Sequence, residues 1–273
     1  MRKIVVINQK GGVGKTTTVV NLAAGLALQG KKVLIIDLDP QGNVSTYLNV
    51  SSPKDIHDVL INNVDPKICI VNALENLDVI PSRETLTKAE MILAGEQSRE
   101  TILKRGLKEI KGYDFVFIDC APSLGLLNQN AILYANEIFI PASTDILALT
   151  GLRNMIKAIE KINDIFSHNA EITKIIPTMF DQRNKVCKDV LAKMQQEWSD
   201  LLGEPIRVNS KLKESPGSGT SIFGYDNSCR GAKDYQALVN AVLGKQVMEP
   251  MTVQARIEPA DTGRTIVRRT LHH

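Results

Sequence analysis

The sequence predicts an α/β fold in which a doubly wound, mostly parallel sheet carries helices on both faces. Short runs of β-branched and other apolar residues recur along the chain, and segments with helical periodicity separate them. The runs are apolar throughout, which is typical of strands that are covered on both faces of a sheet. Strands that alternate with helices favour parallel pairing, and such sheets bind ligands at the carboxyl ends of their strands.

The predicted elements alternate from the first residues onward. Each strand is an uninterrupted apolar run such as Ile4–Ile7, and each helix has apolar residues at helical spacing, such as Leu22 and Leu26. The predicted strands cover residues 4–7, 33–36, 77–80, 115–118, 138–140 and 172–176. The predicted helices cover residues 16–29, 98–110, 126–135, 151–166, 185–201 and 231–243. Residues 215–219, rich in serine and glycine, predict a loop before the last helix.

Length and composition predict one large domain with a short extension. The chain has 273 residues, of which 43% are hydrophobic, so a single large core is possible. We assign residues 1–243 to this domain. Residues 244–273 lose helical periodicity, are interrupted by Pro250 and Pro259, and are expected to form a weakly ordered tail. With 33 basic and 30 acidic residues, the charge balance does not by itself indicate a nucleic-acid partner.

The cysteines and the N-terminus exclude several classes of protein. Four cysteines are widely spaced, form no C-x-x-C pair and share no ligand spacing with the histidines, so they predict neither a disulfide framework nor a zinc site. We interpret them as small buried apolar residues. The first strand begins almost at Met1, and no apolar stretch approaches 18 residues. We therefore expect a soluble cytoplasmic protein without a signal peptide.

A glycine-rich turn between the first strand and the first helix predicts a phosphate site. Backbone N–H groups of such a turn converge on an anion, and the helix N-terminus adds partial positive charge. In this motif Lys15 reaches the β- and γ-phosphates and the Thr16 hydroxyl binds Mg²⁺, so the expected ligands are a nucleoside triphosphate and Mg²⁺. The turn departs from the ordinary motif because Gln9 stands at the position of its first glycine and Lys10 follows. The predicted nucleotide-binding residues of the turn are Lys10, Gly11, Gly12, Val13, Gly14, Lys15, Thr16 and Thr17.

Two further strands end in carboxylates. Asp37 and Asp39 follow the second strand, so one could hold a water in line with the γ-phosphate and the other could support the Mg²⁺ shell; alternatively they form a cap or an Asx-turn. Asp119 follows the apolar run 115–118, the arrangement in which a buried strand delivers a carboxylate to the metal's water shell. Residues 122–125 suit a switch loop that rearranges when the γ-phosphate leaves.

These motifs together resemble the ParA/MinD group of P-loop NTPases with a deviant Walker A motif. The chain most resembles ParA-type partition ATPases of the short form, which lack an N-terminal helix-turn-helix. The likeness extends from residue 3 to about residue 243. The segments that carry it are residues 10–17, 37–43, 119–125, 177–183, 211–216, 225–226 and 230–232.

The resemblance implies a role for each site residue. Lys10 would reach across a dimer interface to the partner's phosphates, and Lys15 would contact the β- and γ-phosphates. Asp39 would orient the attacking water, so that Lys10, Lys15 and Asp39 are the expected catalytic residues. The expected metal site comprises Thr16, Asp39 and Asp119. Asn209 falls where the family contacts adenine, although Arg207 and Ala121 stand where prolines are usual.

The resemblance also places candidate DNA contacts. Arg183 and Lys211 match basic positions of the family, and Arg207 and Lys213 are possible neighbours. These residues would contact phosphates without reading sequence. Their alternative interpretation is an ordinary solvated basic surface. Sequence-specific operator binding is not expected.

The leading hypothesis is a DNA-activated ATPase. Its ATP-bound homodimer would coat non-specific double-stranded DNA of the nucleoid, and a ParB-like partner would stimulate slow hydrolysis, so that DNA, whether chromosome or plasmid, is segregated. One alternative is a protein cargo. A second is a MinD-like membrane switch, for which the basic end of the tail is too short to anchor well. A third is a reductase with an iron-sulfur cluster, for which Cys120 has no matching partner.

Overall fold

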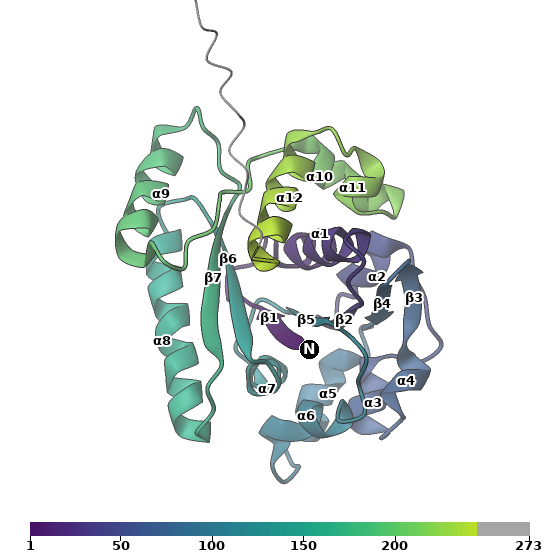
Figure 1. Cartoon of the computed structure of the whole chain (residues 1–273). Coiled ribbons are helices and arrows are strands. Elements are labelled where there is room, and N and C mark those ends of the chain that lie inside the picture. Colours follow the sequence, from purple (N-terminus) through teal and green to yellow (C-terminus); the bar gives the residue numbers. More distant parts are fainter. Residues whose placement is uncertain (245–273) are drawn as a thin grey trace, which may run out of the picture.

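The computed structural model describes residues 1–244, which form one seven-stranded sheet between two layers of helices (Figure 1). The strands are β1 (Arg2–Val6), β2 (Val33–Leu38), β3 (Val71–Leu74), β4 (Leu77–Ile80), β5 (Phe115–Cys120), β6 (Glu137–Ser143) and β7 (Glu171–Thr178). Their order is β3-β4-β2-β5-β1-β6-β7, and every neighbouring pair is parallel except β3 with β4. The predicted mostly parallel sheet is therefore confirmed.

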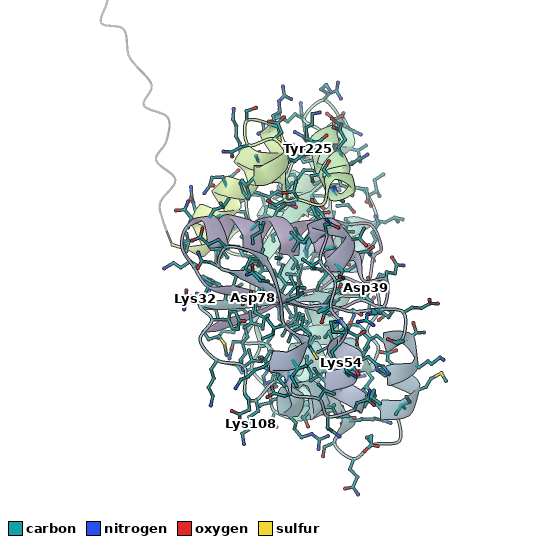
Figure 2. All side chains as sticks on the ribbon, turned by 90° about the vertical axis from the view of Figure 1, so that its right-hand side faces the viewer. Lys32, Asp39, Lys54, Asp78, Lys108 and Tyr225 are labelled. Carbon is teal, nitrogen blue, oxygen red and sulfur yellow. The ribbon has the colours of Figure 1, made fainter. Side chains whose placement is uncertain are left out.

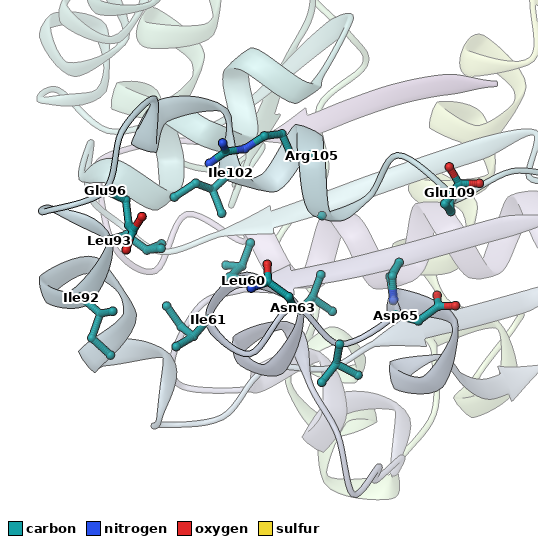
Figure 3. Close-up of a pocket in the computed structure, with 14 residues that line it drawn as sticks. Leu60, Ile61, Asn63, Asp65, Ile92, Leu93, Glu96, Ile102, Arg105 and Glu109 are labelled. Carbon is teal, nitrogen blue, oxygen red and sulfur yellow. The ribbon is translucent and has the colours of Figure 1, made fainter.

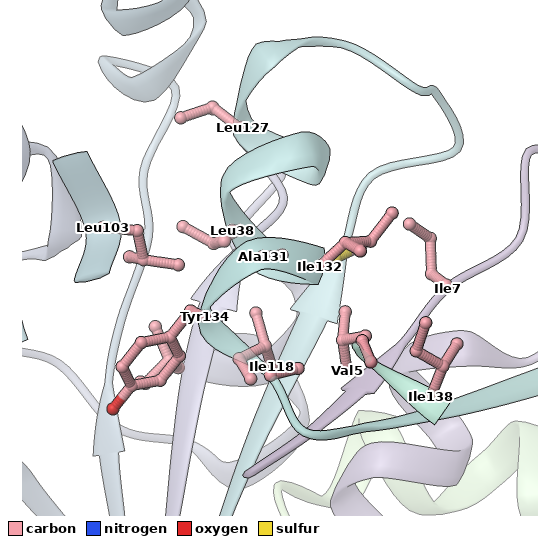
Figure 4. Packing of buried hydrophobic residues seen from close by; sticks show 14 of the residues in the cluster. Val5, Ile7, Leu38, Leu103, Ile118, Leu127, Ala131, Ile132, Tyr134 and Ile138 are labelled. Carbon is pink, nitrogen blue, oxygen red and sulfur yellow. The ribbon is translucent and has the colours of Figure 1, made fainter. Parts of the chain in front are cut away.

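Two apolar clusters hold the helices against the two faces of this sheet. Consecutive strand residues point to opposite faces, so Ile4 and Val6 join one cluster while Val5 and Ile7 join the other. The first cluster includes residues of α1, α2, α11 and α12, and the second includes residues of α3 to α9. Figure 4 shows part of the second cluster, with Ala131 and Ile132 of α7 beside strand residues such as Val5 and Ile118. The helices are α1 (Lys15–Leu28), α2 (Asn43–Leu48), α3 (Ile56–Ile61), α4 (Pro66–Cys69), α5 (Leu86–Leu93), α6 (Ile102–Gly106), α7 (Leu126–Tyr134), α8 (Ala148–Phe166), α9 (Lys185–Trp198), α10 (Ser210–Glu214), α11 (Ile222–Tyr225) and α12 (Arg230–Val242).

Strand register brings the predicted carboxylates together. In the pairing of β2 with β5, Asp37 lies opposite Asp119 at the carboxyl end of both strands. The loop after β1 reaches the same edge because β1 runs parallel to β5. Figure 2 shows Asp39 beyond this edge and Lys32, which precedes β2, at the opposite edge. One edge of the sheet therefore collects all three predicted nucleotide motifs.

The region between β2 and β5 was predicted least well. The sequence analysis missed β3 and helices α2 to α5, because each is short and repeats its apolar pattern over too few residues. The predicted helix 98–110 was too long: it comprises a 3₁₀ turn at Arg99–Thr101 followed by α6, which ends at Gly106. Residues 107–110 bury Leu107 and Ile110 without continuing the helix, so their apolar pattern reflects packing onto the core.

The structure also tests the expectations for the cysteines and for membrane-spanning helices. All four cysteines are free; Cys69, Cys120 and Cys187 are buried, as expected of small apolar residues, and Cys229 is half-buried. Within residues 1–244 we find no helix with the length and apolar character needed to cross a bilayer. The predicted tail, apart from Gly244, lies outside the described residues.

Candidate nucleotide-binding site

The loop between β1 and α1 forms an anion cradle. Gly12 and Gly14 adopt left-handed backbone angles, with φ of 71° and 86°, which a side chain would strain. Gly14 precedes the first turn of α1, where no side chain caps the helix and no acidic residue occurs. The N-terminal N–H groups of α1 are therefore left for an anionic ligand, which the helix dipole also favours.

A cavity of about 490 Å³ opens beside this loop. Its walls include the glycines of the loop, Lys15, Thr16 and Asp39, together with Pro122 of the loop after β5. A smaller cavity of about 190 Å³ shares Gly14, Thr17 and Met179 with it. The two cavities are therefore adjoining parts of one site, one polar enough for phosphates and one with the more apolar walls that a base requires.

Lys15 lies within this site. Its side chain is buried, and Nζ donates a hydrogen bond to the Lys10 carbonyl oxygen at 3.2 Å. Burial lowers the pKa of the Lys15 ammonium, and the nearby Asp119 and Asp39 carboxylates oppose this shift. A buried cation beside free N–H groups is suited to bind a phosphate.

Asp119 and Thr16 form the candidate metal site. Thr16 Oγ1 donates to Asp119 Oδ2 at 2.6 Å, while the buried Asp119 Oδ1 has no hydrogen-bond partner among the described residues. Burial raises the pKa of Asp119 to about 7, and the Asp39 carboxylate adds to this shift. An unsatisfied buried carboxylate oxygen next to a threonine hydroxyl fits the hard oxygen donors that Mg²⁺ prefers.

Asp37 and Asp39 divide their roles. Both oxygens of the fully buried Asp37 accept backbone hydrogen bonds, from Asp39 N at 2.9 Å and Val44 N at 3.2 Å. Burial and the Asp119 charge raise the Asp37 pKa well above its ordinary value. Asp37 therefore forms the turn and holds the start of α2, as the capping interpretation expected. Asp39 also accepts from Gln41 N at 3.0 Å, yet it lines the larger cavity.

Lys10 precedes Gly11, a residue that lines the larger cavity, and its own side chain contacts residues at the carboxyl end of β6. Its ammonium forms an ion pair with Asp145 and a hydrogen bond to Ser143 Oγ at 3.2 Å. Ser143 Oγ donates to the same Asp145 carboxylate at 2.6 Å. The sequence analysis missed Asp145 and Ser143, although both stand at the carboxyl end of β6, where the rule that placed Asp39 and Asp119 would have found them.

The smaller cavity contains the predicted adenine contact. Asn209 lines it, caps α10 by accepting from Lys211 N at 2.8 Å, and shares the cavity with Val13 and Tyr235. Arg207 also lines it, but its guanidinium forms a bidentate ion pair with Asp234, with a shortest distance of 2.6 Å. Arg207 thus stabilises the wall of the cavity, which distinguishes it from the other candidate DNA contacts.

The other candidate DNA contacts, Arg183, Lys211 and Lys213, come from two neighbouring segments of the chain. A bridge between Phe180 and Arg207 sets the segments after β7 and before α10 side by side, and Arg183 and Lys211 follow within four residues of it. The Arg183 side chain is 92% exposed beside Asp181, and Lys211 Nζ lies 2.9 Å from Glu214 Oε2. Lys213 is also exposed. The ion pairs of Arg183 and Lys211 are at the surface, so they could be exchanged for contacts with phosphates at little cost.

The loop after Asp119 and the start of α7 are held by hydrogen bonds to Glu90 and Asn128. Glu90 of α5 accepts a hydrogen bond from Leu127 N at 3.0 Å, at the start of α7, and its carboxylate would have to shift to admit a Cβ at Gly125. Asn128 donates to the carbonyls of Ala121 and Ser123 at 2.8 and 2.6 Å. Sequence analysis missed Glu90 because a single glutamate in an unpredicted helix carries no local signal.

Comparison with known proteins identifies the family. A family model described as an AAA domain matches residues 1–173. The chain is 39% identical over 250 residues to the sporulation initiation inhibitor protein Soj of Bacillus subtilis, covering 89% of this chain and 98% of Soj. It is 38% identical over 247 residues to the chromosome-partitioning ATPase Soj of Treponema pallidum, with the same two coverages.

A solved structure agrees with the sequence matches. The crystal structure of cobyrinic acid a,c-diamide synthase from Mycobacterium smegmatis with a bound ATP analogue and magnesium is 32% identical, with a TM-score of 0.76. The match covers 89% of this chain and 94% of that one. With its phosphate loop, two carboxylate motifs and these matches along most of its length, the chain belongs to the ParA/Soj family of P-loop partition ATPases.

Proposed function

We propose that this protein is a cytoplasmic, nucleoid-associated ATPase that dimerises when it binds ATP and Mg²⁺ and then binds DNA non-specifically. Slow hydrolysis, accelerated by DNA and a ParB-like partner, would release it and so drive the segregation of chromosomal or plasmid DNA. The observation that carries this proposal is the division between two lysines of one loop. Lys15 is buried and lines the larger cavity, whereas the Lys10 side chain is 43% exposed and forms an ion pair with Asp145.

The residues of the site support the nucleotide part of the proposal. The loop N–H groups and Lys15 would bind the phosphates, and Asn209 would contact the base. Thr16 and Asp119, with Asp39 nearby, would hold Mg²⁺, which supplies charge neutralisation at the phosphates when it is bound. Asp39 lines the same cavity, and from there it would orient the attacking water.

Exposed apolar residues at the carboxyl edge of the sheet support dimerisation. Ile146 and Leu147 follow β6 and are 70% and 74% exposed, and Met179 follows β7 and is 47% exposed. They belong to the carboxyl edge of the sheet, as Lys10 does. A second copy of the chain that covered this edge would bury these side chains and bring its own Lys10 towards the phosphates.

Basic side chains near the bridge between Phe180 and Arg207 support DNA binding. Arg183, Lys211 and Lys213 would contact phosphates near the edge that the proposed dimer shares. Three such contacts on each of two copies would make binding strongly dependent on both dimerisation and salt concentration. Arg207 would act indirectly, by holding the wall from which Lys211 and Lys213 extend.

Co-sedimentation with long non-specific duplex DNA tests this proposal. We expect binding with ATP and Mg²⁺ and little with ADP. Lys15→Ala should abolish nucleotide binding and DNA binding together. Lys10→Ala should retain ATP but lose the dimer, the DNA complex and at least about tenfold in hydrolysis rate, because one developing charge loses its cation.

Lys157→Ala, which removes an exposed lysine of α8, is the matched control and should change neither binding nor hydrolysis. Equal DNA binding with ADP and ATP, or full activity of the Lys10→Ala variant, would contradict the proposed cycle.

A further inference from the structure

A second cavity, with a volume of about 680 Å³, lies between α3, α5 and α6 on the other side of the sheet from α1 (Figure 3). Its floor is apolar: Leu60, Leu93 and Ile102 are each buried, with at most 8% exposure. Ile92 stands at its rim and is 49% exposed. We call this cavity the α3–α6 groove; it contains none of the nucleotide motifs.

The charges of the α3–α6 groove are mostly negative. Glu96 lies towards one end and Asp65 and Glu109 towards the other, with apolar side chains between them (Figure 3). Arg105 also lines the groove, and Lys111 lies 3.6 Å from Glu109 outside it. Three carboxylates against one guanidinium favour an occupant that carries cations on both sides of an apolar centre.

Other cavities of the described chain have the opposite balance. One at the amino edge of the sheet is lined by Lys32 and Lys111 against Asp78. Another beside α12 contains Lys233 and no acidic residue. A cationic segment is therefore attracted to the α3–α6 groove more than to either of these surfaces.

The end of the chain has the complementary pattern. Arg264 precedes Ile266 and Val267, and Arg268 and Arg269 follow them. Residues 264–273 contain no aspartate or glutamate. The order of cation, apolar pair and cations matches the order of carboxylate, apolar floor and carboxylates in the groove. We propose that residues 264–271 of the chain bind in its own α3–α6 groove.

The described chain ends close enough to the α3–α6 groove for the following residues to reach it. The Val242 carbonyl accepts from Arg2 Nη1 at 2.6 Å, and Arg2 N donates to the Asp114 carbonyl at 2.8 Å, five residues beyond Glu109. From Gly244, a link of about 20 residues spans at most about 70 Å, more than the diameter of a domain this size. A tethered segment also has a millimolar effective concentration, an advantage that a separate partner lacks.

Photo-crosslinking of the full-length protein tests the proposal. A benzoylphenylalanine at position 267 should crosslink within the same chain to residues 59–66, 92–96 or 102–109, as mapped by mass spectrometry. Glu96→Lys with Glu109→Lys should reduce this yield by about fivefold, because surface charge contacts are individually weak. Adding Arg268→Glu with Arg269→Glu to that variant should restore most of the yield, since the charges are then exchanged.

Matched variants and labelling make each outcome decisive. Glu160→Lys with Asp164→Lys makes the same charge change on exposed α8 positions and should leave the yield unchanged. If the groove variant misfolds, Arg268→Glu with Arg269→Glu alone should give the same loss without altering the groove. Adducts elsewhere on the domain, or yields insensitive to both reversals, overturn the proposal. Adducts between isotopically light and heavy chains would assign the groove to a second copy and also overturn it.

Discussion

At the scale of single residues, the phosphate loop places two lysines in opposite electrostatic situations. Lys15 is buried, and burial lowers the pKa of its ammonium, so that a phosphate would relieve an unfavourable desolvation. Lys10 and its partner Asp145 have side chains 43% and 45% exposed. An exposed ion pair contributes at most about 1 kcal/mol, so a phosphate could readily replace it.

Asp145 is therefore expected to compete with the dimer for Lys10. Asp145→Asn removes the charge but keeps an oxygen that can accept from Leu147 N, as Oδ1 does at 3.1 Å. We expect the ATP-dependent dimer to form at about two- to fivefold lower protein concentration, which corresponds to the free energy of an exposed ion pair. Sedimentation equilibrium with a non-hydrolysable ATP analogue measures this. Asp164→Asn on α8 is the control, and an unchanged dimer constant for Asp145→Asn would refute the competition.

At the scale of elements, the packing of α12 on α1 shapes the site. Thr18 Oγ1 and the buried Tyr235 hydroxyl lie 3.2 Å apart, and Tyr235 also lines the smaller cavity. The two helices approach closely at Gly25, where an added Cβ would lie 2.5 Å from Val239 Cγ2. The helix that begins at the phosphate loop is thus held by the helix that lines the proposed base site.

Replacing this glycine tests the packing. Gly25→Ala improves helix propensity by up to about 1 kcal/mol, but overpacking costs about 1–3 kcal/mol, so we expect a net loss of about 1–2 kcal/mol in the free energy of unfolding. Gly151→Ala in α8 is the matched control, because nothing lies within 4 Å of its added Cβ. Urea denaturation should show a loss for the first and a small gain for the second. Equal gains in the free energy of unfolding of both variants would contradict this prediction, because they would mean that α12 moves away from the added methyl group at no cost in stability.

At the scale of the whole molecule, Arg2 connects parts of the chain that are far apart in sequence. Its Nε and Nη2 each donate to the Glu137 carboxylate at 2.6 Å, joining β1 to β6. Its Nη1 reaches the Val242 carbonyl at the end of α12. Thr173 Oγ1 of β7 also donates to Glu137, at 3.2 Å. The amino edge of the sheet is therefore fastened while the carboxyl edge is left for ligands.

The Arg2–Glu137 pair predicts a pH dependence of stability. The hydrogen bond from Arg2 lowers the pKa of Glu137 below its ordinary value of 4.5, so this stabilisation is present above that value and is lost as the pH falls through the folded-state pKa. Glu137→Gln should lower the free energy of unfolding by about 1 kcal/mol at about pH 7, since the pair is only partly buried. The difference should vanish once the pH has fallen below the lowered folded-state pKa of Glu137, where this carboxyl is protonated in both the folded and the unfolded state. Denaturation of both proteins at about pH 7 and at low pH measures this difference in the free energy of unfolding. A difference that stayed constant with pH would mean that the substitution acts through packing and not through the charge of Glu137.

The success of the sequence analysis depended on how local each signal was. The apolar cores of β1, β2, β4, β5, β6 and β7 were predicted because each is a continuous run, and the phosphate loop because its glycines and lysines are consecutive. The short antiparallel β3 was missed because its four residues are only half covered. The motif alone left open whether Asp37 or Asp39 faces the ligand, and the family resemblance pointed to Asp39, since two residues of the same type two positions apart differ only in what surrounds them.

From the sequence alone we predicted a mostly parallel α/β sheet with a triphosphate site, and the misfit at Gln9 and Lys10 indicated the family. These properties depend on consecutive residues, whose periodicity and backbone requirements act locally. The ion pair of Lys10 with Asp145, the hydrogen bond from Leu127 at the start of α7 to Glu90, and the ion pair of Arg207 with Asp234 became known from the three-dimensional structure. Each of these contacts joins residues at least 27 positions apart, and burial and charge across such separations exist only once the strands have taken their order in the sheet.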